Sequence, residues 1–122
     1  PFIYVRSKPK EHGLTNTIEG DLKHGQHVLV VEDTISTGGS SLKAVSDLRA
    51  AGAEVAGMIA IYKYGFESAV QRFEDEGVIL KTLTNYEFLI RVAERDGYIS
   101  KDELETLQSW RSNPQDWSQK NS

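Results

Sequence analysis

The chain has 122 residues, of which 39% are hydrophobic, so residues 1–122 can form a single domain with a modest core. Its formal charge of −4, from 18 acidic and 14 basic residues, excludes the overall basic field by which nucleic-acid-binding proteins neutralise phosphates. Cysteine is absent, which excludes disulfides and thiolate metal sites, and no apolar run approaches the roughly 20 residues of a membrane span. We therefore expect a cytoplasmic protein that binds neither nucleic acid nor membrane.

The first residues have the character of a strand. Phe2–Val5 is aromatic and β-branched, and the chain starts on it without an initiator methionine, which suggests a piece of a longer protein. Residues 7–17 are polar and basic with little apolar content to anchor them. We expect this segment to be a mobile loop that leads to a short strand near residues 18–20.

Two apolar segments indicate a parallel sheet. Val28–Val31 and Val55–Tyr62 are continuous rather than alternating, a pattern typical of strands buried on both faces of such a sheet. Between them, helical spacing of apolar residues predicts a helix that starts near Gly39 or Ser40 and stops at Gly52. Strand, glycine-rich turn, helix and strand form a right-handed βαβ unit.

A second crossover extends the sheet. It consists of a helix over Glu67–Glu76, a cap at Gly77 and a strand over Val78–Thr84. The sequence therefore predicts an α/β fold with a parallel, Rossmann-like sheet.

Two helices end the chain. Thr84 and Glu87 have capping-box spacing for a helix through Arg95, and Ser100 with Glu103 repeats the signal for a helix to about residue 112. The tail, residues 113–122, is polar and expected to fray. The two tryptophans, at 110 and 117, are expected to make packing or dimer contacts rather than to stack on a ligand.

Hydroxyl groups and glycines are concentrated directly after the first buried strand. The run from Thr34 to Ser41 carries five hydroxyl groups, while Gly38 and Gly39 let the backbone approach a ligand with its N–H groups pointing inward. The helix that follows aims its N-terminus at the same spot, which favours a phosphate by roughly 0.3–1 kcal/mol. Ligands of open α/β sheets bind at this carboxyl edge of the strands. The run therefore predicts a phosphate site.

Two acidic residues, Glu32 and Asp33, precede this run. Carboxylates at the end of an apolar strand repel each other and lose hydration unless a cation or a hydroxyl-bearing ligand meets them. A phosphorylated ribose suits the site, because its phosphate fits the loop and its 2- and 3-hydroxyls fit the acids. The run lacks the Gly-Lys-Ser/Thr of the nucleotide-triphosphate loop and the Gly-x-Gly-x-x-Gly of the dinucleotide fingerprint. The structural alternative is a plain βα connection capped by serine.

These motifs resemble those of a known family. The run from Val30 to Ser40, VVEDTISTGGS, resembles the phosphoribosyl-pyrophosphate (PRPP) signature of class I phosphoribosyltransferases. Upstream, YVRSKPKEHG from Tyr4 to Gly13, followed by IEG at residues 18–20, is similar to the catalytic loop of orotate phosphoribosyltransferases. The resemblance implies the C-terminal part of such an enzyme, without the N-terminal hood and the short pyrophosphate loop.

The resemblance also implies a reaction. The phosphoribosyl group passes from PRPP to orotate with Mg²⁺, giving orotidine 5-phosphate and pyrophosphate in pyrimidine (UMP) synthesis. It implies a homodimer in which the loop Arg6–His12 enters the neighbouring site. Lys10, His12 and Asp33 are implied to be catalytic, and Ser36 also touches orotate. Mg²⁺ is expected to be held mainly by substrate, with Glu32 and Asp33 as water-mediated partners. The positions implied to bind PRPP are Arg6, Lys10, His12, Glu32, Asp33, Thr34, Ile35, Ser36, Thr37, Gly38, Gly39 and Ser40.

The chemistry of the residues fits this division. Breaking the C1–O bond leaves oxocarbenium-like charge on the sugar and growing negative charge on the diphosphate, so nearby cations contribute most. Arg6, Lys10 and Mg²⁺ suit that task, with His12 as a proton or hydrogen-bond donor. Some relatives place an arginine against orotate near the end of the second buried strand, where this chain has YKYG at residues 62–65. The contacts of the orotate carboxylate therefore stay open.

Two alternatives remain at this point. Another class I phosphoribosyltransferase, acting on a purine in salvage, would share the signature at residues 30–40, but it would carry a different sequence at Arg6–His12. A non-catalytic, nucleotide-sensing relative would keep the core but would not need Lys10 and His12 to clamp a leaving group.

Overall fold

The structure is a computed structural model that describes residues 1–7 and 17–117. Lys10 and His12, and most of the loop expected over residues 7–17, lie outside the described residues. The elements are β1 (Tyr4–Val5), β2 (Ile18–Glu19), β3 (His27–Ile35), α1 (Gly39–Ala50), β4 (Glu54–Lys63), α2 (Glu67–Asp75), β5 (Leu80–Asn85), α3 (Tyr86–Arg95) and α4 (Lys101–Ser112).

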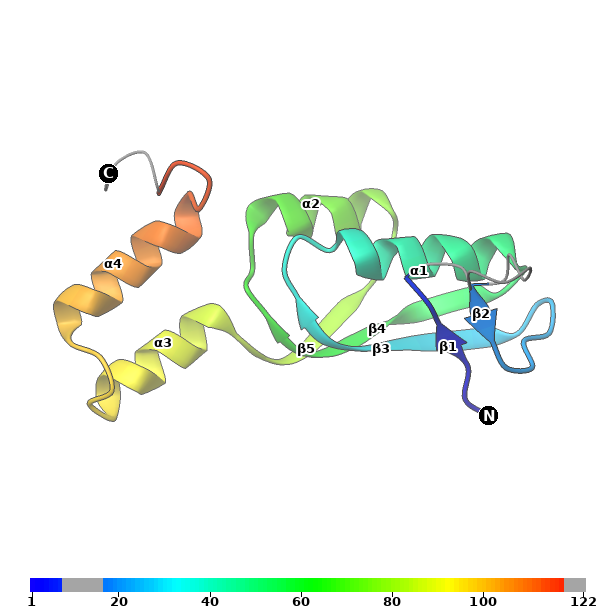
Figure 1. Ribbon diagram of the computed structural model, residues 1–122, viewed down its shortest axis with the longest axis horizontal. Coiled ribbons are helices and arrows are strands. Elements are labelled where there is room, and N and C mark those ends of the chain that lie inside the picture. The colour runs from blue at the N-terminus through cyan, green and yellow to red at the C-terminus, as the bar shows by residue number, and fades with distance from the viewer. Residues whose placement is uncertain (8–16, 118–122) are drawn as a thin grey trace.

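The main sheet is parallel and has the strand order β3-β4-β5. Its two crossovers contain α1 and α2, which lie on the same side of the sheet (Figure 1). A separate antiparallel pair, β1 and β2, joins Tyr4 to Glu19 and Val5 to Ile18, so the short strand expected near residues 18–20 is confirmed. The predicted α/β fold with a parallel sheet is likewise confirmed.

The core lies between the sheet and the two crossover helices. α1 buries Leu42, Val45 and Leu48 at the helical spacing that the sequence indicated, and α1 ends where predicted, just before Gly52 at φ +88°. The central cluster of buried side chains consists of Ile35, Leu42, Val45, Met58, Ala60, Phe73 and Val78.

The expected burial of both sheet faces is wrong for this chain. α1 and α2 cover one face, and no described element covers the other (Figure 1). Successive strand residues alternate between the faces, so every second apolar side chain of these continuous runs is exposed. This open sheet face carries Leu29, Val31, Ile59, Ile61 and Leu83, which are 38–79% exposed.

One of the two predicted helix starts needs correction. Ser100 and Glu103 form the expected capping box of α4, with both reciprocal hydrogen bonds present. Thr84 does not cap α3, because β5 continues through it; the side chain of Asn85 accepts from Phe88 N instead. Glu87 therefore takes no part in a capping box and pairs with Arg91 on the same helix.

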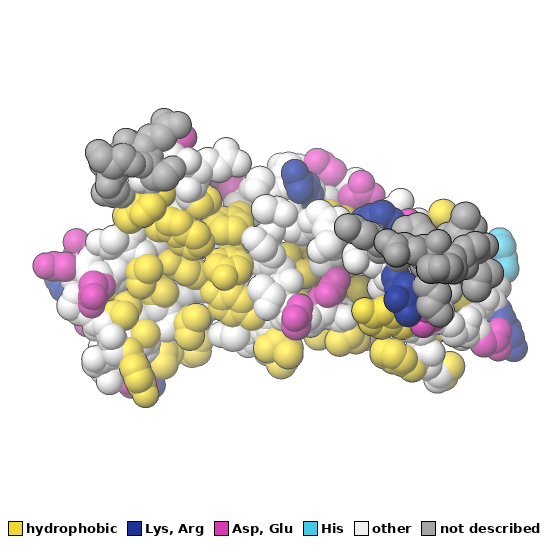
Figure 2. All heavy atoms as spheres, in the orientation of Figure 1, with side chains coloured by type: hydrophobic (Ala, Val, Ile, Leu, Met, Phe, Trp, Pro, Cys, Tyr) yellow, Lys and Arg dark blue, Asp and Glu magenta, His cyan; other side chains and the backbone are white. Residues whose placement is uncertain are grey.

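α3 and α4 form a hairpin beyond the carboxyl ends of the strands (Figure 1). Apolar side chains gather across this hairpin and along the side of the sheet away from α1 and α2 (Figure 2). Across residues 1–7 and 17–117, no helix has the length and apolar character needed to cross a membrane.

Candidate functional site

The site is built where β3 ends and α1 begins. β3 ends at Ile35 and α1 begins at Gly39, so Ser36, Thr37 and Gly38 make the turn between them. The N-cap is Gly38, no side chain accepts a capping hydrogen bond, and the first turn of α1 contains no acidic residue. The amides of that turn therefore meet no competing side-chain cap, and together with the helix dipole they favour an anion. The serine cap of the structural alternative is not present.

Two features of position 38 require glycine: its backbone conformation and the packing of a neighbouring side chain. Its φ of +80° lies in the left-handed region, and a Cβ built there would stand 2.8 Å from Cε2 of Phe73. Phe73 belongs to α2 and is 5% exposed, so the ring is fixed in the core beneath the turn. Helix α2, in the second crossover, therefore packs against the turn between β3 and α1, which begins the first crossover.

Arg72, next to Phe73 on α2, also contacts this turn. Its Nη1 donates a hydrogen bond of 3.4 Å to the carbonyl of Thr37. Because the peptide between Thr37 and Gly38 is trans, its N–H points away from the carbonyl that Arg72 holds. Arg72 thus favours an orientation in which the Gly38 amide faces away from the guanidinium.

The sequence interpretation missed Arg72. An arginine on the exposed face of a helix more than 30 residues downstream carries no local signal for a phosphate loop. Only the packing of α2 beside α1 brings the two together.

The hydroxyl groups of the signature fall into two sets. Thr34, Ser36, Thr37 and Ser40 are exposed and available to a ligand. Ser41 is 3% exposed, so its hydroxyl lies within the packed side of α1. Gly39 is also open, with the Arg72 guanidinium 3.7 Å from an ideal Cβ at its position. The exposed hydroxyls and the exposed Gly39 lie at positions expected to hold the ribose phosphate, whereas Gly38 is buried.

The two acids lie at the end of β3 as predicted, but they are not desolvated together. Consecutive residues of a strand point to opposite faces, so Glu32 and Asp33 diverge. Asp33 is exposed, and its Oδ1 accepts from Thr34 N at 2.6 Å. Glu32 is half-buried and lines a groove of about 550 Å³ between the β1 segment and β3. The expected cost of burying both carboxylates is therefore wrong for Asp33, while both remain open to hydroxyl groups of a ligand.

Arg6 is the one expected loop cation within the described residues. It sits at the end of β1, where its Nε contacts Glu19 Oε1 at 2.6 Å across the β1–β2 pair, and its amide donates to Thr17 O. The hydrogen bond to Glu19 and its charge raise the pKa of Arg6. A diphosphate would therefore compete with Glu19 for this guanidinium.

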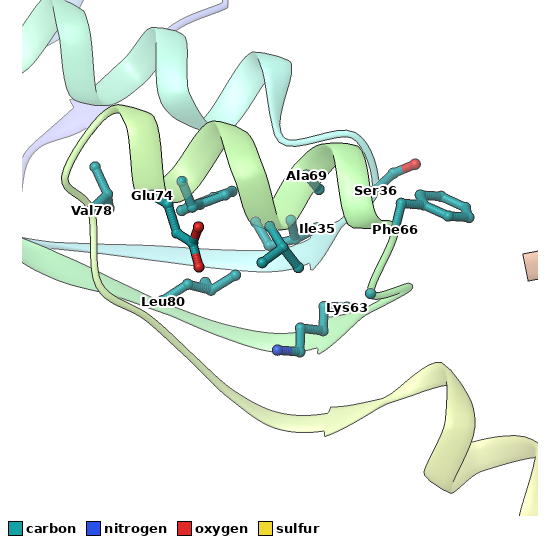
Figure 3. Close-up of a pocket in the computed structure, with 11 residues that line it drawn as sticks. Ile35, Ser36, Lys63, Phe66, Ala69, Glu74, Val78 and Leu80 are labelled. Atoms are coloured by element: carbon teal, nitrogen blue, oxygen red, sulfur yellow. The ribbon is translucent and has the colours of Figure 1, made fainter. Parts of the chain in front are cut away.

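A separate apolar pocket of about 190 Å³ lies between α2 and β5 (Figure 3). Ser36 and Phe66 lie at one end of it, and Glu74 and Val78 lie toward the other. It touches the phosphate signature only at Ser36 and the preceding Ile35, and most of its lining is apolar. This pocket therefore adjoins the candidate ribose-phosphate site and is distinct from it.

The described residues contain no cluster of three or more histidine or acidic side chains that could hold a metal ion alone. Glu32 and Asp33 are the acids of the signature. Mg²⁺ accepts a coordination sphere made of waters, substrate phosphates and one or two carboxylates. The donor set therefore fits a magnesium ion held chiefly by a phosphorylated substrate.

Comparison with known proteins supports the resemblance seen in the motifs. The orotate phosphoribosyltransferase of Bacteroides fragilis is 58% identical over 117 residues, which is 96% of this chain and 55% of the relative. The chain thus spans about half the length of the curated relatives it matches. A comparison with models of protein families gave no match.

Solved structures lead to the same group. The orotate phosphoribosyltransferase of Aeropyrum pernix is 31% identical, covers 80% of this chain with 52% of its own length, and has a TM-score of 0.64. That of Mycobacterium tuberculosis, solved in complex with PRPP, is 38% identical, covers 56% of this chain with 41% of its own length, and has a TM-score of 0.51.

The parallel α/β fold of the chain is that of the class I phosphoribosyltransferase family, to which its neighbours among solved structures belong. Within this family, the relatives that it resembles over nearly its whole length are orotate phosphoribosyltransferases, as its motifs predicted.

Proposed function

We propose that the protein containing this chain transfers the phosphoribosyl group from PRPP to orotate, giving orotidine 5-phosphate and pyrophosphate in pyrimidine synthesis. The observation that carries the proposal is the run Glu32–Ser40. Its acids lie near the end of a parallel strand, its glycine turn leaves helix amides without a side-chain cap, and the same run resembles the PRPP signature. The identity to orotate phosphoribosyltransferases supports orotate as the acceptor.

Each part of the run has its own task in this proposal. The amides of Gly38 and Gly39 and the hydroxyls of Thr37 and Ser40 bind the 5-phosphate. The carboxylates of Glu32 and Asp33 accept hydrogen bonds from the ribose hydroxyls. Thr34 and Ile35 contribute backbone contacts between these two groups, and Ser36 lies on the side of the acceptor base.

The basic segment Arg6–His12 completes the proposed mechanism. As the C1–O bond breaks, negative charge grows on the diphosphate, and Arg6 and Lys10 stabilise it. His12 donates a hydrogen bond or a proton to the same leaving group. Arg6 would exchange Glu19 for the diphosphate, which couples substrate binding to movement at the end of β1. Bound Mg²⁺ supplies positive charge to the diphosphate, with Glu32 and Asp33 ordering its waters.

We also propose that the active protein is a cytoplasmic homodimer in which Arg6–His12 reaches the neighbouring site. A cation supplied by the partner would leave each subunit incomplete alone. Mixing Lys10→Ala subunits with Asp33→Asn subunits tests this arrangement, because each hybrid dimer regains one site that carries neither substitution. Recovery of activity on mixing is expected, and its absence under confirmed subunit exchange contradicts the shared site.

The reaction is tested with the full-length protein, PRPP, Mg²⁺ and orotate, by following the loss of orotate absorbance. Formation of orotidine 5-phosphate is expected. Turnover with adenine or hypoxanthine but not orotate would assign a purine salvage enzyme, and nucleotide binding without turnover would assign a sensor. Lys10→Ala should lower kcat by about 10²-fold with a smaller effect on PRPP binding. An unchanged kcat would remove Lys10 from the mechanism.

A further inference from the structure

Helix α4 reaches back to the edge of the sheet that carries the candidate site. Nη1 of Arg111, on α4, donates a hydrogen bond of 3.1 Å to the carbonyl of Gly65, which follows β4. Gly65 has a φ of +74°, and an ideal Cβ there would stand 3.8 Å from the same nitrogen. The guanidinium thus packs directly against a backbone turn that a side chain would strain.

Aromatic rings reinforce this contact. The Trp110 ring lies 6.0 Å from Tyr64, 5.8 Å from Phe66 and 5.5 Å from Tyr86, between centroids. Tyr64 and Phe66 stack on each other with an interplanar angle of 1°. Tyr86 also donates its hydroxyl proton to the carbonyl of Leu107 on α4. Such ring pairs stabilise packing beyond the burial of their area, so α4 is held firmly against the segment that follows β4.

That segment is tied in turn to the phosphate signature. The amide of Tyr64 donates to the carbonyl of Ile35 at 3.0 Å, immediately before Ser36. Ser36, labelled in Figure 3, and Gly65 both line the pocket between α2 and β5, and they follow the carboxyl ends of the neighbouring parallel strands β3 and β4. A chain of contacts therefore runs from Arg111 through Gly65 and Tyr64 to the residue that is proposed to face the acceptor base.

We propose that Arg111 is a positioning residue that sets the acceptor side of the site by holding the Tyr64–Phe66 segment, with Trp110 packed beside it. This inference rests on the proposed function, in which a flat carboxylated base binds next to Ser36. Arg111 acts through the backbone of Gly65 and does not itself take part in the chemistry.

The environment of Arg111 fits a fixed brace rather than a surface charge. Its Nε is buried and finds no hydrogen-bond partner among the described residues, which costs free energy that an exposed arginine would not lose. The hydrogen bond to Gly65 and the surrounding rings offset that cost. By contrast, Arg95 in the same hairpin is 71% exposed and pairs only with its neighbour Asp96 in the described structure.

The test compares Arg111→Ala, Arg111→Lys and Arg95→Ala in the full-length protein. We expect Arg111→Ala to raise the KM for orotate about tenfold and to leave the KM for PRPP within about twofold. The reason is that displacement of the Tyr64–Phe66 segment affects only the acceptor base that binds next to it. Arg111→Lys should restore part of the loss, since an ammonium can still donate to the Gly65 carbonyl. Arg95→Ala should match the unsubstituted protein. Equal rises in both KM values, or no rise in either, would overturn the proposal.

A second measurement separates this inference from the proposed function and from loss of folding. Hydrogen exchange should speed up at the Tyr64 amide in Arg111→Ala and to a smaller extent in Arg111→Lys, while the core amide of Met58, bonded to Ile79 O, keeps its protection. Unchanged exchange at Tyr64 would overturn the brace whatever the enzyme acts on. Faster exchange at Tyr64 in a protein that does not use orotate would retain the brace and refute the proposed acceptor.

Discussion

Two neighbouring residues of α2, Arg72 and Phe73, contact the backbone of the turn between β3 and α1. Phe73 fills the space where a Cβ of residue 38 would project, and Arg72 donates a hydrogen bond to the carbonyl of Thr37. The turn therefore owes its shape to a helix that lies outside the signature. Substitutions on α2 should accordingly affect PRPP binding without touching PRPP.

Gly38→Ala tests the packing under the turn. The φ of +80° alone costs an alanine about 1–2 kcal/mol, and the contact with Phe73 adds to it, so we expect a loss of more than about 2 kcal/mol in the free energy of unfolding and weaker PRPP binding. Gly77→Ala is the matched control, since φ is +61° there but nothing lies within 4 Å. Denaturant unfolding measures the free energy of unfolding of both variants. Equal losses in Gly38→Ala and Gly77→Ala would show that the Phe73 ring imposes no constraint.

Arg72→Ala tests the orientation of the peptide. Without the guanidinium, the Thr37 carbonyl is free to rotate, and we expect PRPP to bind about three- to tenfold more weakly, from a loss on the order of 1 kcal/mol. Arg49→Ala is the control, because Arg49 donates to the Glu76 carbonyl at 2.8 Å, away from the site. Isothermal titration with PRPP distinguishes the two. If Arg49→Ala weakens binding as much, the effect is general and not due to the turn.

Tyr62 gives a pH dependence at alkaline pH. Burial, and then the neighbouring Tyr64 and Tyr86, raise its pKa from 10.0 to about 12. Between these values the unfolded chain loses the phenol proton while the folded chain keeps it, so stability present below pH 10 is lost as pH rises toward 12. Between pH 10 and pH 12, the free energy of unfolding of Tyr62→Phe should fall by about 1 kcal/mol less than that of the unsubstituted chain, as measured by urea unfolding. Parallel curves would place the Tyr62 phenol in a water-like environment.

At the scale of elements, the start of α3 depends on a residue one position beyond the one that the sequence pattern favoured. Asn85→Ala should destabilise the protein by about 1 kcal/mol, because the side chain that accepts from Phe88 N is lost. Thr84→Val keeps the β-branched shape within β5 and should cost less than about 0.5 kcal/mol. Thermal unfolding monitored by circular dichroism measures both. The reverse order would restore Thr84 as the cap.

The elements that could be predicted from sequence are those fixed by local chemistry. The glycine stops at Gly52 and Gly77, the apolar spacing of α1 and the Ser100 capping box all depend on neighbours within a few residues. Thr84 and Asn85 both suit an N-cap, and only the length of β5 decides between them.

The site divides in the same way. Strand, turn and helix N-terminus could be read from the run Glu32–Ser40, because that run is continuous in the sequence. The contacts of Arg72 with Thr37 and of Arg111 with Gly65 could not, because they span 35 and 46 residues and depend on how helices pack against the sheet. The burial of Asp33 was also misjudged, since it depends on what covers the second face of the sheet.

At the scale of the whole molecule, the strands carry apolar residues on both faces of the sheet, but helices cover only one face in the structure. Apolar side chains fill both faces of β3 and β4, yet α1 and α2 cover only one of them (Figure 1). Val45, on the side of α1 that packs against the sheet, is 0% exposed, whereas Val31, on the open sheet face, is 72% exposed. Substitutions of these two valines therefore compare the covered face and the open face of the sheet within one chain.

This asymmetry predicts opposite outcomes for one substitution made in the 122-residue chain. Val45→Thr buries a hydroxyl in the core and should cost about 1–3 kcal/mol in the free energy of unfolding. Val31→Thr keeps a β-branched residue in a strand, leaves its hydroxyl in water and should change stability by less than about 0.5 kcal/mol. It should also reduce the binding of an apolar fluorescent dye, because it removes apolar area from the open sheet face. A cost for Val31→Thr as large as that for Val45→Thr would show that this face is covered in solution.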